Sequence, residues 1–96
     1  MKTGTTSTGF AFSFDEQNAN DMRMIELIAI SDDKDASEFS KLAASSKILE
    51  LLLGKEQKEA LYDHIGKAHE GGRVPVEDLM AALKEIMTAG GDSLKN

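Results

Sequence analysis

The sequence predicts an α+β fold that is mainly α, with an N-terminal β-hairpin packed on about four short helices. Phe and small residues alternate from Phe10 to Phe14, which is typical of a strand with one buried face. Apolar residues recur at helical spacing through much of the remaining chain. The length of 96 residues corresponds to one domain. We therefore expect a single core shared by the hairpin and the helices.

The hairpin is predicted to consist of residues 2–6 and residues 10–14. The first segment is rich in Thr, which favours strands, and Ser7, Thr8 and Gly9 can form the turn. Because side chains alternate along a strand, the three Phe rings of the second segment should share one face. A lone hairpin is barely stable in water, so this face is expected to pack on the helices.

A first helix is expected to end near Ile30. Its main apolar stripe, which should be buried, consists of Met22, Ile25, Ile28 and Ala29, and Met24, Leu27 and Ile30 widen it. After an acidic loop, the segment Asp35-Ala-Ser-Glu resembles a capping box at the start of a second helix. Residues 43–46 (Ala-Ala-Ser-Ser) are weakly apolar, so that helix is either continuous or kinked there. Gly54 is expected to end it.

Two more helices are expected on either side of a Gly-rich loop. The third covers residues 55–68, and its buried side is predicted to hold Leu61, Tyr62, Ile65 and Ala68. Pro75 can occupy the first turn of the fourth. That helix has Val76, Leu79, Leu83 and Ile86 on one face, which should be buried, with Met80 and Met87 beside them. Because Gly90 and Gly91 follow, residues 1–89 are expected to form the domain and residues 90–96 a flexible tail.

The composition limits the classes of partner. The formal net charge is −6, which would repel duplex DNA and anionic membranes. The N-terminal segment has no apolar run typical of a signal peptide, and no apolar run is long enough to cross a bilayer. There is no Cys, which fits a reducing compartment. We therefore expect a cytoplasmic protein that binds neither nucleic acid nor membrane.

The loop after the third helix has the order of an EF-hand but not its ligands. With Gly72 at the sixth position, the first, third and fifth positions are Lys67, His69 and Gly71, and none is a carboxylate. His64 and His69 are five residues apart, which favours two solvent-exposed histidines over a zinc site. The loop is therefore interpreted as a hinge between packed helices, without a metal ion or cofactor.

No catalytic group is predicted either. Asp63 and His64 are adjacent and point to different sides of a helix. Ser45 and Ser46 lie within a predicted helix instead of a strand–turn–helix elbow. A DNA-binding helix–turn–helix would need a basic second helix, whereas the fourth helix is acidic. The protein is thus not expected to be an enzyme.

Several segments nevertheless resemble a known family. Leu52 to Ile65 (LLGKEQKEALYDHI), followed by Gly71 to Met87 (GGRVPVEDLMAALKEIM), is similar to the tail assembly chaperones of long-tailed siphoviruses and prophages of Gram-positive bacteria. Phe12-Ser-Phe-Asp-Glu followed by an acidic helix is also similar to the start of those proteins. The resemblance covers nearly the whole chain. The sequence departs from many relatives in residues 68–72, where they carry an acidic Glu-Asp-Gly, and in residues 43–46.

The resemblance implies a function in virion morphogenesis. Such chaperones bind the tail tape measure protein and keep it soluble in the host bacterial cytoplasm until the tail tube polymerises around it. They often self-associate, a longer form can arise by ribosomal frameshifting, and they are not expected in the mature virion.

The apolar surface that would hold such a client is expected on two helices. Met side chains adapt to varied partners, so the candidate partner contacts, expected to be partly exposed, are Met24, Leu27, Met80 and Met87. The alternative reading is a small helical adaptor or regulatory module that binds another protein.

Overall fold

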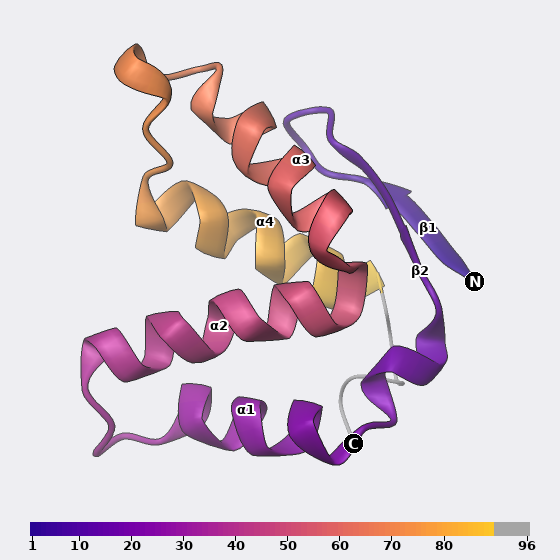
Figure 1. The fold of residues 1–96 in the computed structure, drawn as a ribbon, viewed down its shortest axis with the longest axis vertical. Helices are drawn as coiled ribbons and strands as arrows, with labels where there is room; N and C mark the ends of the chain where they lie inside the picture. The colour runs from indigo at the N-terminus through magenta and orange to yellow at the C-terminus, as the bar shows by residue number, and fades with distance from the viewer. Residues whose placement is uncertain (90–96) are drawn as a thin grey trace.

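The computed structural model describes residues 1–89 and confirms the predicted mainly α, α+β architecture (Figure 1). The predicted tail, residues 90–96, lies outside the described residues. The elements in chain order are β1 Lys2–Thr5, β2 Ala11–Phe14, the 3-10 helix η1 Glu16–Ala19, α1 Met22–Asp32, α2 Glu38–Leu53, α3 Lys55–Gly66, the 3-10 turn η2 Glu70–Gly72 and α4 Val76–Ala89.

The hairpin is antiparallel, and its register pairs Gly4 with Phe12. Phe10, Phe12 and Phe14 are all buried, so the predicted aromatic face is the packed one. A Cβ on Gly4 would lie 2.7 Å from the Phe12 ring, which shows that this ring lies directly over the opposite strand. Gln57 of α3 bonds both the backbone N–H and C=O of Ser13, at 2.9 and 2.6 Å, and so attaches β2 to the helices.

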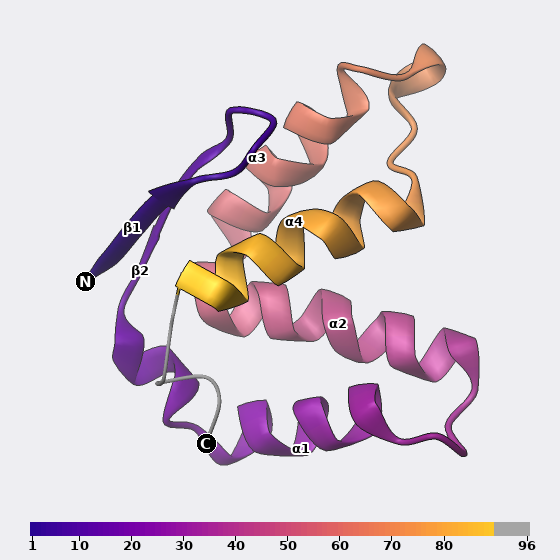
Figure 2. The ribbon, with the colours of Figure 1, turned by 180° about the vertical axis from the view of Figure 1, so that it is seen from behind.

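The helices pack on one another, and the hairpin lies beside them. α1 lies along α2 on the side away from α4, and the hairpin lies next to α3 and one end of α4 (Figures 1 and 2). The core between them consists of Phe10, Phe12, Phe14, Met24, Ile48, Leu49, Leu52, Leu53, Leu61, Ile65, Ala82, Leu83 and Ile86. None of the helices within residues 1–89 combines the length and the apolar character needed to cross a bilayer.

The boundaries of α2 differ from the prediction at one end. The N-cap is Ser37, whose hydroxyl accepts a hydrogen bond from the Ser40 N–H at 3.1 Å, so the cap lies two residues after the predicted Asp35. The helix is continuous through residues 43–46, and the Ser45 hydroxyl donates to the Lys41 carbonyl within it. Gly54 ends α2 with a φ of 86°, as predicted.

The loop between α3 and α4 turns through two glycines with positive φ, Gly71 and Gly72. Gly66 allows the loop to fold back, since a Cβ there would lie only 2.7 Å from the Gly72 carbonyl oxygen. The carbonyl of Pro75 accepts the first hydrogen bond of α4. Val76 is 51% exposed, so the expectation that it lies on the buried face of α4 was wrong.

The third helix is shorter than predicted. α3 ends at Gly66 instead of residue 68, and Ala68, predicted on its buried side, is exposed. Leu61 and Ile65 are buried as predicted, and Tyr62 is half-buried.

Candidate partner-binding surface

α1 exposes three of the four residues in the stripe that the sequence predicts to be buried. Met22 is 66% exposed and Ile25 is 53% exposed. Ala29, one turn further along the same side, is also exposed. Met24, predicted to be partly exposed, is only 1% exposed. The prediction is therefore wrong for Met22, Ile25, Ala29 and Met24, whereas Leu27 and Ile28 are half-buried. Met24 is not available as a partner contact in this fold.

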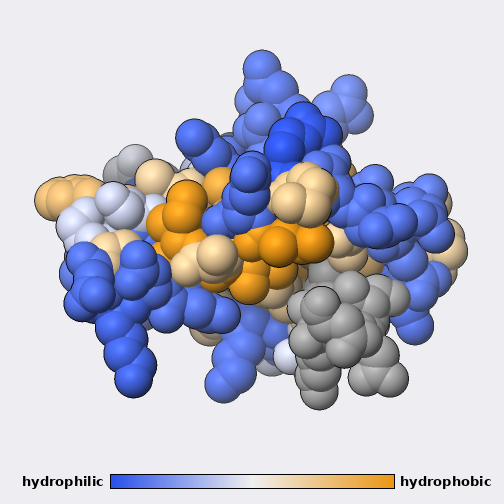
Figure 3. All heavy atoms as spheres, turned by 90° about the horizontal axis from the view of Figure 1, so that it is seen from below, coloured by the Kyte–Doolittle hydropathy of each residue, from blue (hydrophilic) through white to orange (hydrophobic). Residues whose placement is uncertain are grey.

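The packing of α1 on α2 explains the exchange of faces. The buried and half-buried residues of α1 recur at helical spacing, and they are Met24, Leu27, Ile28 and Ser31. Met22, Ile25 and Ala29 follow a second line at i, i+3 and i+7 on the other side, and we call them the α1 stripe. Figure 3 views the molecule from the side on which α1 lies, and apolar atoms gather in the middle of that face among hydrophilic residues. An apolar patch of this kind on a folded domain typically marks an interaction site.

A groove continues the apolar surface from α1 towards α4. It has a volume of about 460 Å³. Its apolar lining consists of Ile28, Ile48, Met80, Leu83 and Met87, and polar residues including Asp32 and Lys84 stand beside them. We call it the α1–α4 groove. Two of the predicted contacts, Met80 and Met87, are thus half-buried and share one groove. Both belong to α4, and the groove is completed by Ile28 of α1 and Ile48 of α2.

A second hollow adjoins the first through Met80. Its volume is about 350 Å³, and we call it the Phe39 groove. It is lined by Phe39, Leu42, Ala43, Ser46, Tyr62, Val74, Val76, Leu79 and Met80. The Phe39 ring is 86% exposed, which is unusual for so large an apolar side chain. The sequence contains no signal for this exposure, because Phe39 lies at the first turn of α2 among residues of apolar spacing.

Leu27, the remaining predicted contact, lies elsewhere. It is half-buried and lines a separate hollow between α1 and α2, together with Ile30 and Leu51. Charged residues of both signs surround that hollow: Arg23, Glu26, Lys47 and Glu50. The predicted contacts therefore do not form one site, because only Met80 and Met87 share a groove.

Among residues 1–89, the pair of groups with shifted pKa values lies at the N-terminus of α1. Asp21 caps the helix by accepting the Arg23 N–H at 2.8 Å, and its other oxygen lies 2.7 Å from the guanidinium. The side-chain hydrogen bond from Arg23, followed by the backbone one, holds the pKa of the Asp21 carboxyl below its ordinary value. The same pair raises the pKa of Arg23. Arg23 is thus occupied by a residue of its own helix.

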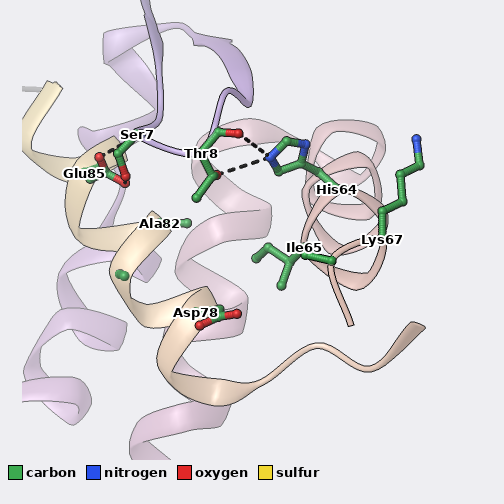
Figure 4. A pocket seen from close by; sticks show the side chains of 10 residues that line it. Ser7, Thr8, His64, Ile65, Lys67, Asp78, Ala82 and Glu85 are labelled. Atoms are coloured by element: carbon green, nitrogen blue, oxygen red, sulfur yellow. Dashed lines mark hydrogen bonds between the residues drawn. The ribbon is translucent and has the colours of Figure 1, made fainter. Parts of the chain in front are cut away.

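A further cavity lies beside the hairpin turn, and both apolar and polar side chains line it (Figure 4). The Ser7 N–H and hydroxyl bind the two carboxylate oxygens of Glu85, at 2.9 and 3.2 Å. The Nε2 of His64 lies 3.2 Å from both the carbonyl and the hydroxyl oxygen of Thr8. These side chains point to the turn, so their evident effect is to anchor the hairpin on α3 and α4.

Both histidines were expected to be solvent-exposed, and this was wrong. His64 is half-buried, and its ring centroid lies 5.6 Å from that of Phe10. His69 is also half-buried, with its Nε2 at 2.6 Å from an Asp78 carboxylate oxygen. Within residues 1–89, no group of three or more Asp, Glu, His or Cys side chains is placed to hold a metal ion. Both rings instead join the end of α3 and its loop to other elements.

Comparison with known proteins identifies no relative: no family model, curated protein or solved structure matches the chain. The class of the protein must therefore be argued from its own surface. The described residues offer exposed apolar side chains on α1 and two connected apolar grooves, and this arrangement can bind another apolar helix or strand by burial of area.

Proposed function

We propose that this protein is a tail assembly chaperone, which binds the tape measure protein and keeps it soluble until the tail tube polymerises around it. The observation that carries the proposal is the α1 stripe together with the α1–α4 groove and the Phe39 groove. Met22, Ile25 and Phe39 lie outside the core of residues 1–89, whereas core residues such as Ile48 and Leu83 line part of the grooves. The exposed side chains are therefore free to contact a client, and the resemblance of the sequence to this family of chaperones indicates which client.

The size of the exposed area fits a chaperone that must later release its client. Burial of a large apolar side chain contributes about 1.5–3 kcal/mol. Met22, Ile25 and Phe39 are 66%, 53% and 86% exposed, so each retains more than half of its area for a partner. Together they offer about 3–6 kcal/mol, to be set against about 4–15 kcal/mol for the loss of free motion on binding. Further contacts in the grooves are needed, and the resulting affinity is modest and reversible.

Co-expression with the tape measure protein tests the proposal. We expect the client to be found in the soluble fraction in the presence of the chaperone and in the pellet in its absence. Ile25→Glu and Met80→Glu should reduce the soluble client, because a charge buried against an apolar partner is strongly unfavourable. Ala60→Glu is the matched control: it adds the same charge at an exposed position of α3 that lines none of the hollows described above.

One result would contradict the proposed function, and another would change only the assignment of Met80. If the unmodified protein leaves its client insoluble, the chaperone function is wrong and a helical adaptor becomes the better account. If Met80→Glu unfolds the protein, as measured by circular dichroism, Met80 belongs to the core. Ile25→Glu, at a half-exposed position, then still tests whether the apolar surface binds the client.

Other features of the proposal follow from the family resemblance. The chaperone would act in the host cytoplasm, before the virion is complete. Self-association and a longer frameshifted product remain predictions, which sedimentation of the purified protein and sequencing of the gene respectively test.

A further inference from the structure

The negative charge of the protein is concentrated around α1. Residues 15–38 contain eight acidic and two basic residues, a formal charge of −6. The remaining 72 residues contain nine acidic and nine basic residues and are therefore neutral overall. The whole formal net charge of the chain thus lies in the segment that carries the α1 stripe.

Two acidic groups near the stripe have no ion-pair partner among the described residues. Among the residues that the structure describes, the ion pair made by α1 is that of Arg23 with Asp21, which uses the single basic residue of the helix. Glu26 and Asp32 are exposed and form no ion pair in residues 1–89. The exposed apolar stripe is thus flanked by two carboxylates that form no ion pair, and Lys47 and Lys84 lie in the neighbouring hollows.

The position of Asp32 is unfavourable for the helix itself. Asp32 is the last residue of α1, Asp33 is its C-cap, and the last turn contains no basic residue. The C-terminal end of a helix carries a partial negative charge, so carboxylates there oppose the helix dipole. An arrangement that does not favour folding is a reason to look for a partner that benefits from it.

We propose that the α1 stripe is the docking site for an amphipathic helix that is flanked by Lys or Arg residues. Its apolar side would cover Met22 and Ile25, and its basic residues would face Glu26 and Asp32. A second copy of this chain is the poorer occupant, because each copy would bring the same negative charge to the interface. This inference rests on the proposed function in one respect: it takes the docked helix to belong to the client.

Synthetic peptides separate the contributions of charge and apolar area. Three labelled peptides of about 20 residues, long enough for several helical turns, are titrated with the protein and followed by fluorescence anisotropy. The first has an apolar stripe flanked by Lys and Arg. The second has the same stripe flanked by Glu. The third keeps the composition of the first but scrambles the apolar spacing. We expect the first to bind at least about tenfold more tightly than the other two.

Variants of the protein locate the site. Glu26→Gln combined with Asp32→Asn should weaken binding of the basic peptide by about threefold to tenfold and reduce its dependence on salt between about 50 and about 500 mM. Met22→Ser combined with Ile25→Ser should weaken it further. Glu56→Gln combined with Glu59→Gln removes the same number of carboxylates from exposed positions of α3, and it should leave the affinity unchanged. The melting temperature of the Asp32→Asn variant should not fall, because Asp32 opposes the helix dipole. A loss of peptide affinity in this variant would then not be due to unfolding.

The outcomes distinguish this inference from the proposed function. Equal binding of the basic and acidic peptides, or an equal effect of the α3 control, would overturn it. A dimer in sedimentation that Ile25→Ser abolishes, without peptide binding, would show that a second copy occupies the stripe. If the basic peptide binds as expected but the tape measure protein stays insoluble, the docking site stands and the chaperone function fails. If the client is kept soluble but no peptide binds, the reverse holds.

Discussion

Replacement of Phe12 by Ala tests whether the hairpin belongs to the core. The Phe12 ring is 5% exposed, and it stacks on Phe14 with the centroids 6.2 Å apart. It also lies over Gly4, which has no side chain that could fill the space left by the ring. Removal of a buried Phe ring costs about 3–5 kcal/mol. Since domains of this kind are stable by about 5–15 kcal/mol, the loss should be a large part of the total.

The chain has no Trp for fluorescence, so urea unfolding is followed by far-ultraviolet circular dichroism to measure this loss of stability. For an m value of about 1.5 kcal/mol/M, the midpoint should fall by about 2–3 M. Phe39→Ala is the matched control, because it removes the same ring from a position that is 86% exposed. Its free energy of unfolding should change by no more than about 0.5 kcal/mol. Equal midpoints for the two variants would refute the packing of the hairpin on the helices.

Three further predictions concern the loop, the cap of α1 and metal ions. Gly66→Ala should destabilise the protein by about 1–3 kcal/mol in the same urea assay, because its Cβ would meet the Gly72 carbonyl oxygen at 2.7 Å; a more stable variant would show that the loop is not held there. The Asp21 carboxyl has a lowered pKa in the folded state because Arg23 bonds its ionised form, so its contribution to stability is present above the ordinary value of 3.8 and is lost as the pH falls through the folded-state pKa. The stability difference between the unmodified protein and Asp21→Asn should therefore be present at neutral pH and disappear in acid, and a difference that is independent of pH would contradict this. Neither calcium nor EDTA should shift the melting temperature, and a saturable calcium isotherm near stoichiometry would overturn the interpretation of the loop as a hinge.

Local features of the fold were predictable because each depends on neighbouring residues alone. The alternation of Phe10, Phe12 and Phe14 specifies a strand with one aromatic face, whatever it packs against. Gly54 ends α2 because a φ of 86° suits Gly. The cap of α2 was misplaced because Asp35 and Ser37 both precede Glu38 closely, and only the path of the loop decides which side chain reaches the helix.

The contacts of the two histidines were not predictable from their spacing. His64 meets Thr8, 56 residues away in the sequence, and His69 meets Asp78 across the Gly-rich turn. Neither partner shares a local motif with its histidine. Such contacts appear only when the hairpin and α4 have been placed against α3, and for this reason the sequence favoured exposure for both rings.

The sequence by itself determined the hairpin, the number of helices and the apolar character of α1, whereas the tertiary structure decided which side of α1 is exposed. Apolar residues lie almost all round this helix, so the period of 3.6 residues does not select a face. Packing on α2 buries Met24 and leaves Met22 and Ile25 in solvent. The same packing brings Ile28 opposite Met80 and Met87 across one groove. Helix periodicity shows which residues share a side of the helix. The packing of the neighbouring helix decides which side stays exposed to a partner.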